Sequence, residues 1–201
     1  PWEPWRPEPT LGTAALKGTG NSLANKLTGN VAANVLAGKG GNDTLSGGGG
    51  NDSLDGGTGN DRLYGGAGID TLIGSSGADS LSGNSGNDIL RGGTGADRLT
   101  GGSGRDSFRY GSVTESGVAS SVRDLITDFV RGEDRINLAT IDARAASAGV
   151  NEAFRFIGSN AFSGDASGLL RYTWNASLET GLLQGSTDAD SAAEFAIQIV
   201  G

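Results

Sequence analysis

The chain has 201 residues, 37 of them glycine, a formal net charge of −8, and neither cysteine nor histidine. The missing residues exclude disulfides, zinc sites built on cysteine or histidine, and catalysis by Ser-His-Asp or Cys-His groups. The negative charge argues against nucleic acid and anionic lipid as partners, and no apolar run reaches the length of a membrane span.

Residues 1–10 read PWEPWRPEPT, in which Pro1, Pro4 and Pro7 recur at the three-residue period of a polyproline II helix. This pattern favours a stiff Pro-rich linker over residues 1–15, and a ligand for a proline-binding domain is the alternative. The chain opens on proline and without a signal peptide, so we expect further sequence upstream in a longer parent protein.

Residues 16–110 form a run of nine-residue repeats, which predicts a stacked repeat fold. Each repeat combines a Gly-rich stretch, an acidic residue and an apolar residue two positions later, as in GGTGNDRLY. The acidic residues are Asp43, Asp52, Asp61, Asp70, Asp79, Asp88, Asp97 and Asp106. The apolar residues run from Leu27 and Leu36 through Leu45, Leu54, Leu63, Leu72, Leu81, Leu90 and Leu99 to Phe108. A flexible linker would not keep aspartate and leucine in phase.

The last three residues of a repeat, such as 62–64, suit a very short strand with one side chain turned inward. The Gly-rich residues before them reverse the chain, because glycine tolerates positive φ. Two repeats then complete one turn of a flattened coil, with leucine stacks between two sheets. Alternate loops share an edge, so Asp43, Asp61, Asp79 and Asp97 line one edge, and Asp52, Asp70, Asp88 and Asp106 line the other.

Carboxylates stacked ~4.8 Å apart oppose folding unless cations lie between them. Calcium accepts 6–8 oxygen ligands in flexible geometry, whereas magnesium demands a stricter octahedron. We therefore predict Ca²⁺ between adjacent loops, with about six sites or more, and folding coupled to metal binding. The expected ligands are the aspartates and the carbonyls of loop glycines: Gly48, Gly50, Gly57, Gly59, Gly66, Gly68, Gly93, Gly95, Gly102 and Gly104. Asn25 and Asn34 occupy the aspartate position in the first repeats and indicate a calcium-free starting cap.

After residue 110 the repeat ends and the composition changes. Short strands are expected in DLITDF (124–129), DRINL (134–138), AFRFIG (153–158), LLRYTW (169–174) and EFAIQIV (194–200), with an Ala-rich turn over 139–149. We interpret residues 111–201 as an antiparallel β cap. The predicted fold is all-β, a right-handed parallel β-roll with this cap at its C-terminal end.

The repeat GGxGxDxUx is the RTX motif, and residues 105–201 resemble the C-terminal region of serralysin-type secreted metalloproteases. The matching segments are RDSFRY, DLITDFVRGEDRINL, FRFIGSNAFSG and GLLRY. The resemblance implies a protein secreted from a Gram-negative bacterium through a type I secretion system, which folds outside the cell on meeting calcium. It also implies that EFAIQIVG is an uncleaved secretion signal and that a catalytic domain lies upstream in the parent protein. The HExxH helix of the proteases is absent, so protease activity does not carry over.

In that family an aspartate after the last repeat helps to close the final calcium site. Asp124 lies eighteen residues after Asp106 and is therefore expected as a ligand on the edge of Asp106. Glu115 has the same offset from Asp97, and a solvated surface position is the expectation for it. Asp128, Glu133 and Asp134 are expected in turns.

These observations predict a non-catalytic calcium-binding RTX module that directs secretion and stabilises a larger extracellular protein. A second hypothesis is a module that binds extracellular polysaccharide of the alginate type, with Tyr64, Tyr172 and Trp174 stacking on sugars. Packing of Trp174 inside the cap and the scattered basic residues argue against it. A third is a glycosidase-like carboxylate pair, which is disfavoured because chelated carboxylates are poor general acids.

Overall fold

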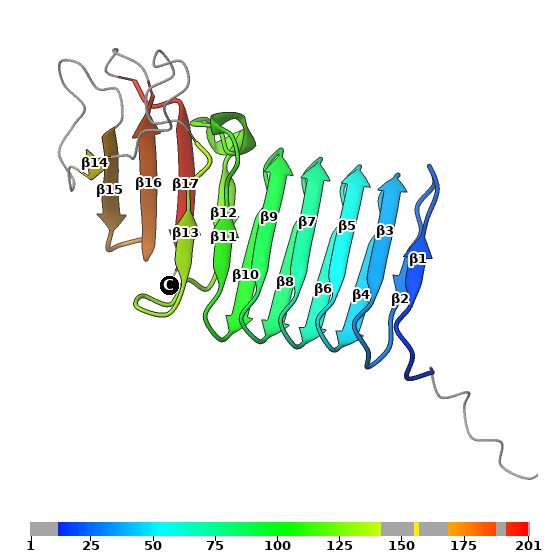
Figure 1. Ribbon diagram of the computed structural model, residues 1–201. Helices are drawn as coiled ribbons and strands as arrows, with labels where there is room; N and C mark the ends of the chain where they lie inside the picture. Colours follow the sequence, from blue (N-terminus) through cyan, green and yellow to red (C-terminus); the bar gives the residue numbers. More distant parts are fainter. Residues whose placement is uncertain (1–11, 142–154, 157–168, 188–191, 201) are drawn as a thin grey trace, which may run out of the picture.

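The computed structural model describes residues 12–141, 155–156, 169–187 and 192–200. Two β-sheets face one another and form a flattened coil, with the first repeats at one end and the C-terminal strands at the other (Figure 1). Most of the Pro-rich segment and of the Ala-rich turn lies outside the described residues, as does most of AFRFIG.

The two sheets are built from alternate repeats. One sheet has seven strands: β1 (Lys17–Thr19), β3 (Val35–Gly40), β5 (Ser53–Thr58), β7 (Thr71–Ser76), β9 (Ile89–Thr94), β11 (Ser107–Arg109) and β13 (Arg135–Asn137). The other has ten strands: β2 (Lys26–Thr28), β4 (Thr44–Gly49), β6 (Arg62–Ala67), β8 (Ser80–Ser85), β10 (Arg98–Ser103), β12 (Asp124–Ile126), β17 (Phe195–Val200), β16 (Thr180–Ser186), β15 (Leu169–Asn175) and β14 (Arg155–Phe156).

The strand register confirms two repeats per turn of the coil. In the parallel pair β4–β6, Leu45 is aligned with Leu63, which lies two repeats later. The complete strands have six residues rather than the expected three, because the ladder continues into the Gly-rich half of the repeat and aligns Gly48 with Gly66. Each loop stacks on the equivalent loop of the next turn, so its backbone groups form hydrogen bonds there.

The core is a single stack of apolar side chains between the sheets, as the repeat pattern predicts. Its members from the repeats are all 2% exposed or less: Leu36, Leu45, Leu54, Leu63, Leu72, Leu81, Leu90, Leu99 and Phe108. Tyr110, Ile126, Ile197 and Ile199 continue the stack toward the C-terminal end. This core is one side chain thick, so the edges of the coil must contribute much of the stability.

The parallel coil extends beyond residue 110. β12 pairs in parallel with β10, and β13 pairs in parallel with β11, so an antiparallel arrangement throughout 111–201 was the wrong expectation for these two strands. Among the described strands only β15, β16 and β17 pair antiparallel, while β17 joins β12 in parallel. DLI and RIN retain the inward side chains Ile126 and Ile136, which lets them extend the existing ladders. Within the described ranges no helix is long and apolar enough to cross a bilayer.

Candidate metal sites

Two ladders of aspartates run along the edges of the coil. The first edge is formed by the loops ending at Asp43, Asp61, Asp79 and Asp97, which lead into the ten-stranded sheet. The second edge is formed by the loops ending at Asp52, Asp70, Asp88 and Asp106, which lead into the seven-stranded sheet. In each ladder the backbone N–H of one aspartate donates to Oδ1 of the aspartate one turn later, at 2.7–2.8 Å. The predicted division of the aspartates into two edges is confirmed.

The second carboxylate oxygen of every repeat aspartate is buried without a hydrogen-bond partner in the part of the chain that the structure describes. These atoms are Oδ2 of Asp43, Asp52, Asp61, Asp70, Asp79, Asp88, Asp97 and Asp106. All eight residues are 3% exposed or less. A buried carboxylate costs several kcal/mol unless a cation or a donor compensates it. Oδ2 is therefore the atom of each aspartate that remains available to a cation.

The glycine that opens each loop provides the space for this oxygen. At Gly47, a Cβ would overlap Oδ2 of Asp52 and would lie 2.6 Å from the carbonyl oxygen of Gly65 in the next loop on the same edge. Gly47 lacks a positive φ, so glycine is needed here for space rather than for backbone freedom. This role of the first glycine was not predicted from the sequence, although its signal there is plain. Glycine opens all eight loops: Gly38, Gly47, Gly56, Gly65, Gly74, Gly83, Gly92 and Gly101.

The predicted carbonyl ligands lie at the second and fourth positions of the loops. All ten of the named glycines, from Gly48 to Gly104, adopt positive φ. The carbonyl oxygens of Gly48 and Gly50 point toward the next loop, where a Cβ on Gly66 or Gly68 would overlap them. In the weaker repeats Lys39, Ser75 and Asn84 take the second position, also with positive φ. We call the space between two loops stacked on one edge a gap. Carbonyl oxygens of the earlier loop thus border each gap.

The ladders end on two further aspartates. Asp97 N–H donates to Oδ1 of Asp124 at 2.9 Å, so Asp124 continues the first edge. The expectation that it lies beside Asp106 was wrong, because the segment containing the 3-10 helices η1 (Val113–Glu115) and η2 (Ser120–Val122) makes the last turn longer than eighteen residues. Asp106 N–H donates instead to Oδ1 of Asp134 at 2.9 Å. Asp134 was expected in a turn and was missed as a member of the second edge.

The two ends differ in how the last carboxylate is satisfied. Oδ2 of Asp134 accepts a 2.8 Å hydrogen bond from the backbone N–H of Val130, which closes the second edge without a metal. Oδ2 of Asp124 and the hydroxyl of Tyr110 lie beside each other, and neither makes a well-aligned hydrogen bond among the described residues. Burial, followed by the charge of Asp124, raises the pKa of Tyr110 well above its ordinary value. The first edge therefore ends on a carboxylate whose neighbour is a neutral hydroxyl rather than a cation.

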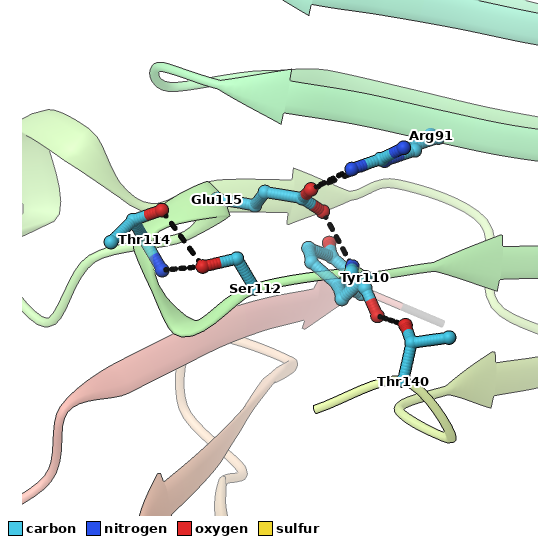
Figure 2. A network of polar contacts seen from close by, with 7 residues as sticks. Arg91, Tyr110, Ser112, Thr114, Glu115 and Thr140 are labelled. Atoms are coloured by element: carbon cyan, nitrogen blue, oxygen red, sulfur yellow. Dashed lines mark hydrogen bonds and ion pairs between the residues drawn. The ribbon is translucent and has the colours of Figure 1, made fainter. Parts of the chain in front are cut away.

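Glu115 is buried beside this end, which corrects its expected place on the solvated surface. Figure 2 shows its carboxylate between Arg91, with which it forms an ion pair, and the start of the loop after Tyr110, where the N–H of Gly111 donates to it at 2.8 Å. Because Arg91 already neutralises Glu115, this carboxylate is a structural group rather than a free ligand.

Burial raises the pKa values of several ladder carboxyls. Burial, opposed by the hydrogen bond from Asp61 and reinforced by neighbouring aspartates, raises the pKa of Asp79 to about 7. Burial likewise raises the pKa of Asp88 and of Asp97 to about 6, and that of Asp124 to about 8. Without a cation these groups therefore retain protons at a pH where exposed aspartate is charged.

The donor set fits a hard cation of flexible geometry. Each gap offers an Oδ2 from one loop, an Oδ1 from the next and several backbone carbonyls, all of them oxygen. Among the described residues no three acidic side chains converge on one point, so carbonyls must complete any coordination sphere. Calcium prefers this mixture, whereas magnesium keeps waters and ideal octahedral geometry. Eight gaps lie between successive ladder aspartates, four on each edge, because Asp124 and Asp134 add one gap to each.

A family model described as Peptidase M10 serralysin C terminal matches residues 19–201. The chain belongs to this serralysin C-terminal family. The match covers both the repeats and the C-terminal strands, and the RTX-type repeat of the serralysin C-terminal region implies calcium as the cation. Searching curated proteins gives no significant match.

Two solved structures from the mannuronan C5-epimerase of Azotobacter vinelandii are similar to this serralysin-type chain. The AlgE6R3 subunit is 20% identical, with a TM-score of 0.43, and the match covers 90% of this chain and 72% of that one. The AlgE6R2 subunit is 22% identical, with a TM-score of 0.39, and the match covers 96% and 88% of the two chains.

Proposed function

We propose that this chain is a calcium-triggered folding module, which binds Ca²⁺ between successive loops on both edges of its coil. The proposed ligands are the ladder aspartates and the glycine carbonyls of the second and fourth loop positions. The observation that carries the proposal is the row of eight buried Oδ2 atoms without partners in the described chain. Without cations this row opposes folding, and with them it joins each loop to the next.

The biological role of calcium-triggered folding depends on where free calcium is found. Inside a bacterium free calcium is scarce, so the repeats stay unfolded, and outside the cell they fold. Family membership supports an extracellular location, and we propose that the module directs type I secretion and stabilises a larger secreted protein. In this proposal the module itself is non-catalytic, residues 16–110 form its repeat unit, and residues 111–201 carry the secretion signal.

Circular dichroism with and without calcium tests the proposal. The chain in chelator should lack the β-sheet signal, and millimolar calcium should restore it, while magnesium at equal concentration should not. Isothermal titration should count several calcium ions per chain. A folded, thermally unchanged chain in chelator would contradict the proposal.

Binding of an acidic polysaccharide is a second candidate, because the structure gathers basic residues that are scattered in the sequence. Arg105, Arg109 and Arg135 line one cleft of about 510 Å³, which Asp106 and Glu133 line as well. Within the described residues none of these three arginines forms an ion pair. Trp174 is 49% exposed in the C-terminal strands and offers a stacking surface.

Affinity electrophoresis of the calcium-loaded module in gels containing a uronate polymer tests this second candidate. The wild-type module should be retarded, and Arg109→Ala combined with Arg135→Ala should abolish the retardation. Equal mobility of the wild type in gels with and without the polymer would exclude this function, whatever the module does with calcium.

A further inference from the structure

On the second edge, a side chain already fills the gap between loop 29–34 and loop 47–52. Asn34 occupies the aspartate position of loop 29–34 and is 1% exposed. Its Oδ1 accepts the N–H of Leu16 at 3.1 Å, as the aspartates accept the N–H of the preceding turn. Its amide nitrogen stands where the aspartates carry their unsatisfied Oδ2. At this one position, therefore, a donor replaces an acceptor.

Four oxygens converge on the amide nitrogen of Asn34. Two are carbonyl oxygens of its own loop, those of Asn30 at 3.4 Å and of Ala32. Two come from the next loop of the edge, the carbonyl oxygen of Gly47 at 3.2 Å and Oδ1 of Asp52 at 2.9 Å. An amide has two hydrogens, so it cannot serve four acceptors with linear bonds. Four oxygens around one position, more than the amide can satisfy, form the acceptor arrangement of a cation site.

The same oxygens recur one turn later without a donor. Around Asp52, the carbonyls of Gly48 and Gly50 take the place that those of Asn30 and Ala32 have around Asn34. From the next loop, the carbonyl of Gly65 takes the place of that of Gly47. Oδ1 of Asp70 likewise takes the place of Oδ1 of Asp52. The nitrogen of Asn34 is replaced there by Oδ2 of Asp52, which faces the carbonyl of Gly65 as a second acceptor. The amide of Asn34 thus marks the cation position of the later gaps.

A second amide closes the preceding gap of the same edge. The side-chain nitrogen of Asn30 donates to the carbonyl oxygens of Gly12 and Ala14, the latter at 2.7 Å. These two carbonyls lie one turn before those of Asn30 and Ala32, at the same loop positions. The side-chain oxygen of Asn30 accepts the N–H of Ala32 at 2.9 Å, which fixes the orientation of the amide.

We propose that the amide nitrogens of Asn30 and Asn34 replace calcium in the two gaps nearest the start of the second edge. The first turns of this edge need no metal, and they present Asp52 to the first calcium-dependent gap in the correct register. This inference rests on the proposed calcium function and adds to it where calcium dependence begins on this edge. Asn25 on the first edge makes a different set of contacts, since its Oδ1 accepts the N–H of Asn21 at 2.7 Å.

Asn34→Asp tests the inference directly, because it restores the acceptor found in every later loop. Titration calorimetry should count one more calcium per chain than in the wild type. The matched control is Asn51→Asp, which makes the same chemical change in the next loop at an exposed position and preserves the acceptor for the N–H of Ile69. It should leave the count unchanged. An unchanged count in Asn34→Asp would overturn the inference, and a wild type that binds no calcium would instead overturn the proposed function.

Asn34→Ala keeps the inference testable if the aspartate variant does not fold. It removes the amide without adding a ligand, so the calcium count should stay at the wild-type value while the melting temperature in saturating calcium falls. Wild-type stability in this variant would show that the amide does not join the loops.

The converse substitution is Asp70→Asn, which places an amide in a gap that otherwise needs calcium. One calcium per chain should be lost, and the difference in melting temperature between calcium and chelator should shrink. Asp70→Ala also removes Oδ1 from the preceding gap, so it should weaken calcium binding in both gaps beside residue 70 and be the less stable of the two variants in calcium. Equal stability of the two variants would contradict the role given to the amide.

Discussion

The carboxylate of Asp124 accepts a 2.9 Å hydrogen bond from the backbone N–H of Asp97, 27 residues earlier in the chain. Elsewhere on this edge the same bond joins aspartates 18 residues apart. Asp124 thereby supplies the last carboxylate of the first edge from outside the repeats, and it sits under the C-terminal strands through the pairing of β12 with β17.

Asp124→Ala should remove one calcium site and lower the melting temperature of the calcium-loaded module. At calcium ten times the dissociation constant, the lost site corresponds to about 1.4 kcal/mol of unfolding free energy. Calorimetric titration and thermal melts measure both effects. Asp55→Asn is the control and should change neither quantity, because it removes the charge of an exposed carboxylate on β5 and keeps an acceptor for the hydroxyl of Ser75. A wild-type calcium count in Asp124→Ala would exclude Asp124 as a ligand.

Gly47→Ala should be far more damaging than Gly49→Ala, although both glycines belong to one loop and neither has a positive φ. A Cβ at Gly47 would displace Oδ2 of Asp52, whereas a Cβ at Gly49 would come no closer than 3.4 Å to Val31. We expect Gly47→Ala to cost about 1–3 kcal/mol through overpacking and to lose a calcium ion as well. Chemical denaturation in calcium compares the two variants, and equal stabilities would refute the spatial role of the first glycine.

The calcium-free module should become less stable as the pH rises. In the folded chain the pKa values of Asp79, Asp97 and Asp124 are raised to about 7, 6 and 8, against 3.8 for an ordinary aspartate. Between about pH 4 and pH 8 the folded state therefore binds more protons than the unfolded state, and its free energy of unfolding falls with rising pH. The stabilising contribution is fully present below about pH 4 and is lost as the pH passes the folded pKa values.

Calcium should reverse this dependence, because it binds the charged carboxylates and must displace their protons. Apparent calcium affinity is then expected to increase from pH 5 to pH 8. Circular dichroism of protein freed of calcium on a chelating resin, together with titrations at each pH, measures both trends. A calcium-free module that gains stability toward pH 8 would contradict the pKa shifts.

Arg91→Ala should destabilise the C-terminal end of the repeats. The side chain of Glu115 is 4% exposed and would lose its charged partner, retaining only the N–H of Gly111. We expect a loss of roughly 1–3 kcal/mol, because a buried charged acceptor is left without its counter-charge. Arg62→Ala, at an exposed position without an ion pair in the described chain, serves as control. Adding Glu115→Gln to Arg91→Ala should recover part of the loss, and a double variant no more stable than the single one would argue against the pair.

Much of the repeat region could be predicted because every repeat has the same length. Equal lengths align Leu45 with Leu63, and they place Asp43 and Asp61 on one edge. The same argument failed for Asp124, since the segment after residue 110 is not a repeat and adds residues to the turn. Spacing alone therefore could not assign Asp124 and Asp134 to their edges, and only the strand pairing of β12 and β13 does so.

The sequence by itself determined the coil, its leucine core and the two rows of aspartates, because a strict nine-residue period permits only one phase between the inward apolar side chains and the loop carboxylates. The tertiary structure decided which oxygen of each aspartate is free, why the first glycine of each loop must lack a side chain, and why Asn34 differs from Asp52. All three depend on contacts between loops one turn apart. The geometry of these contacts is set by how the backbone carbonyls of neighbouring turns converge. The order of residues within a single loop does not determine that geometry.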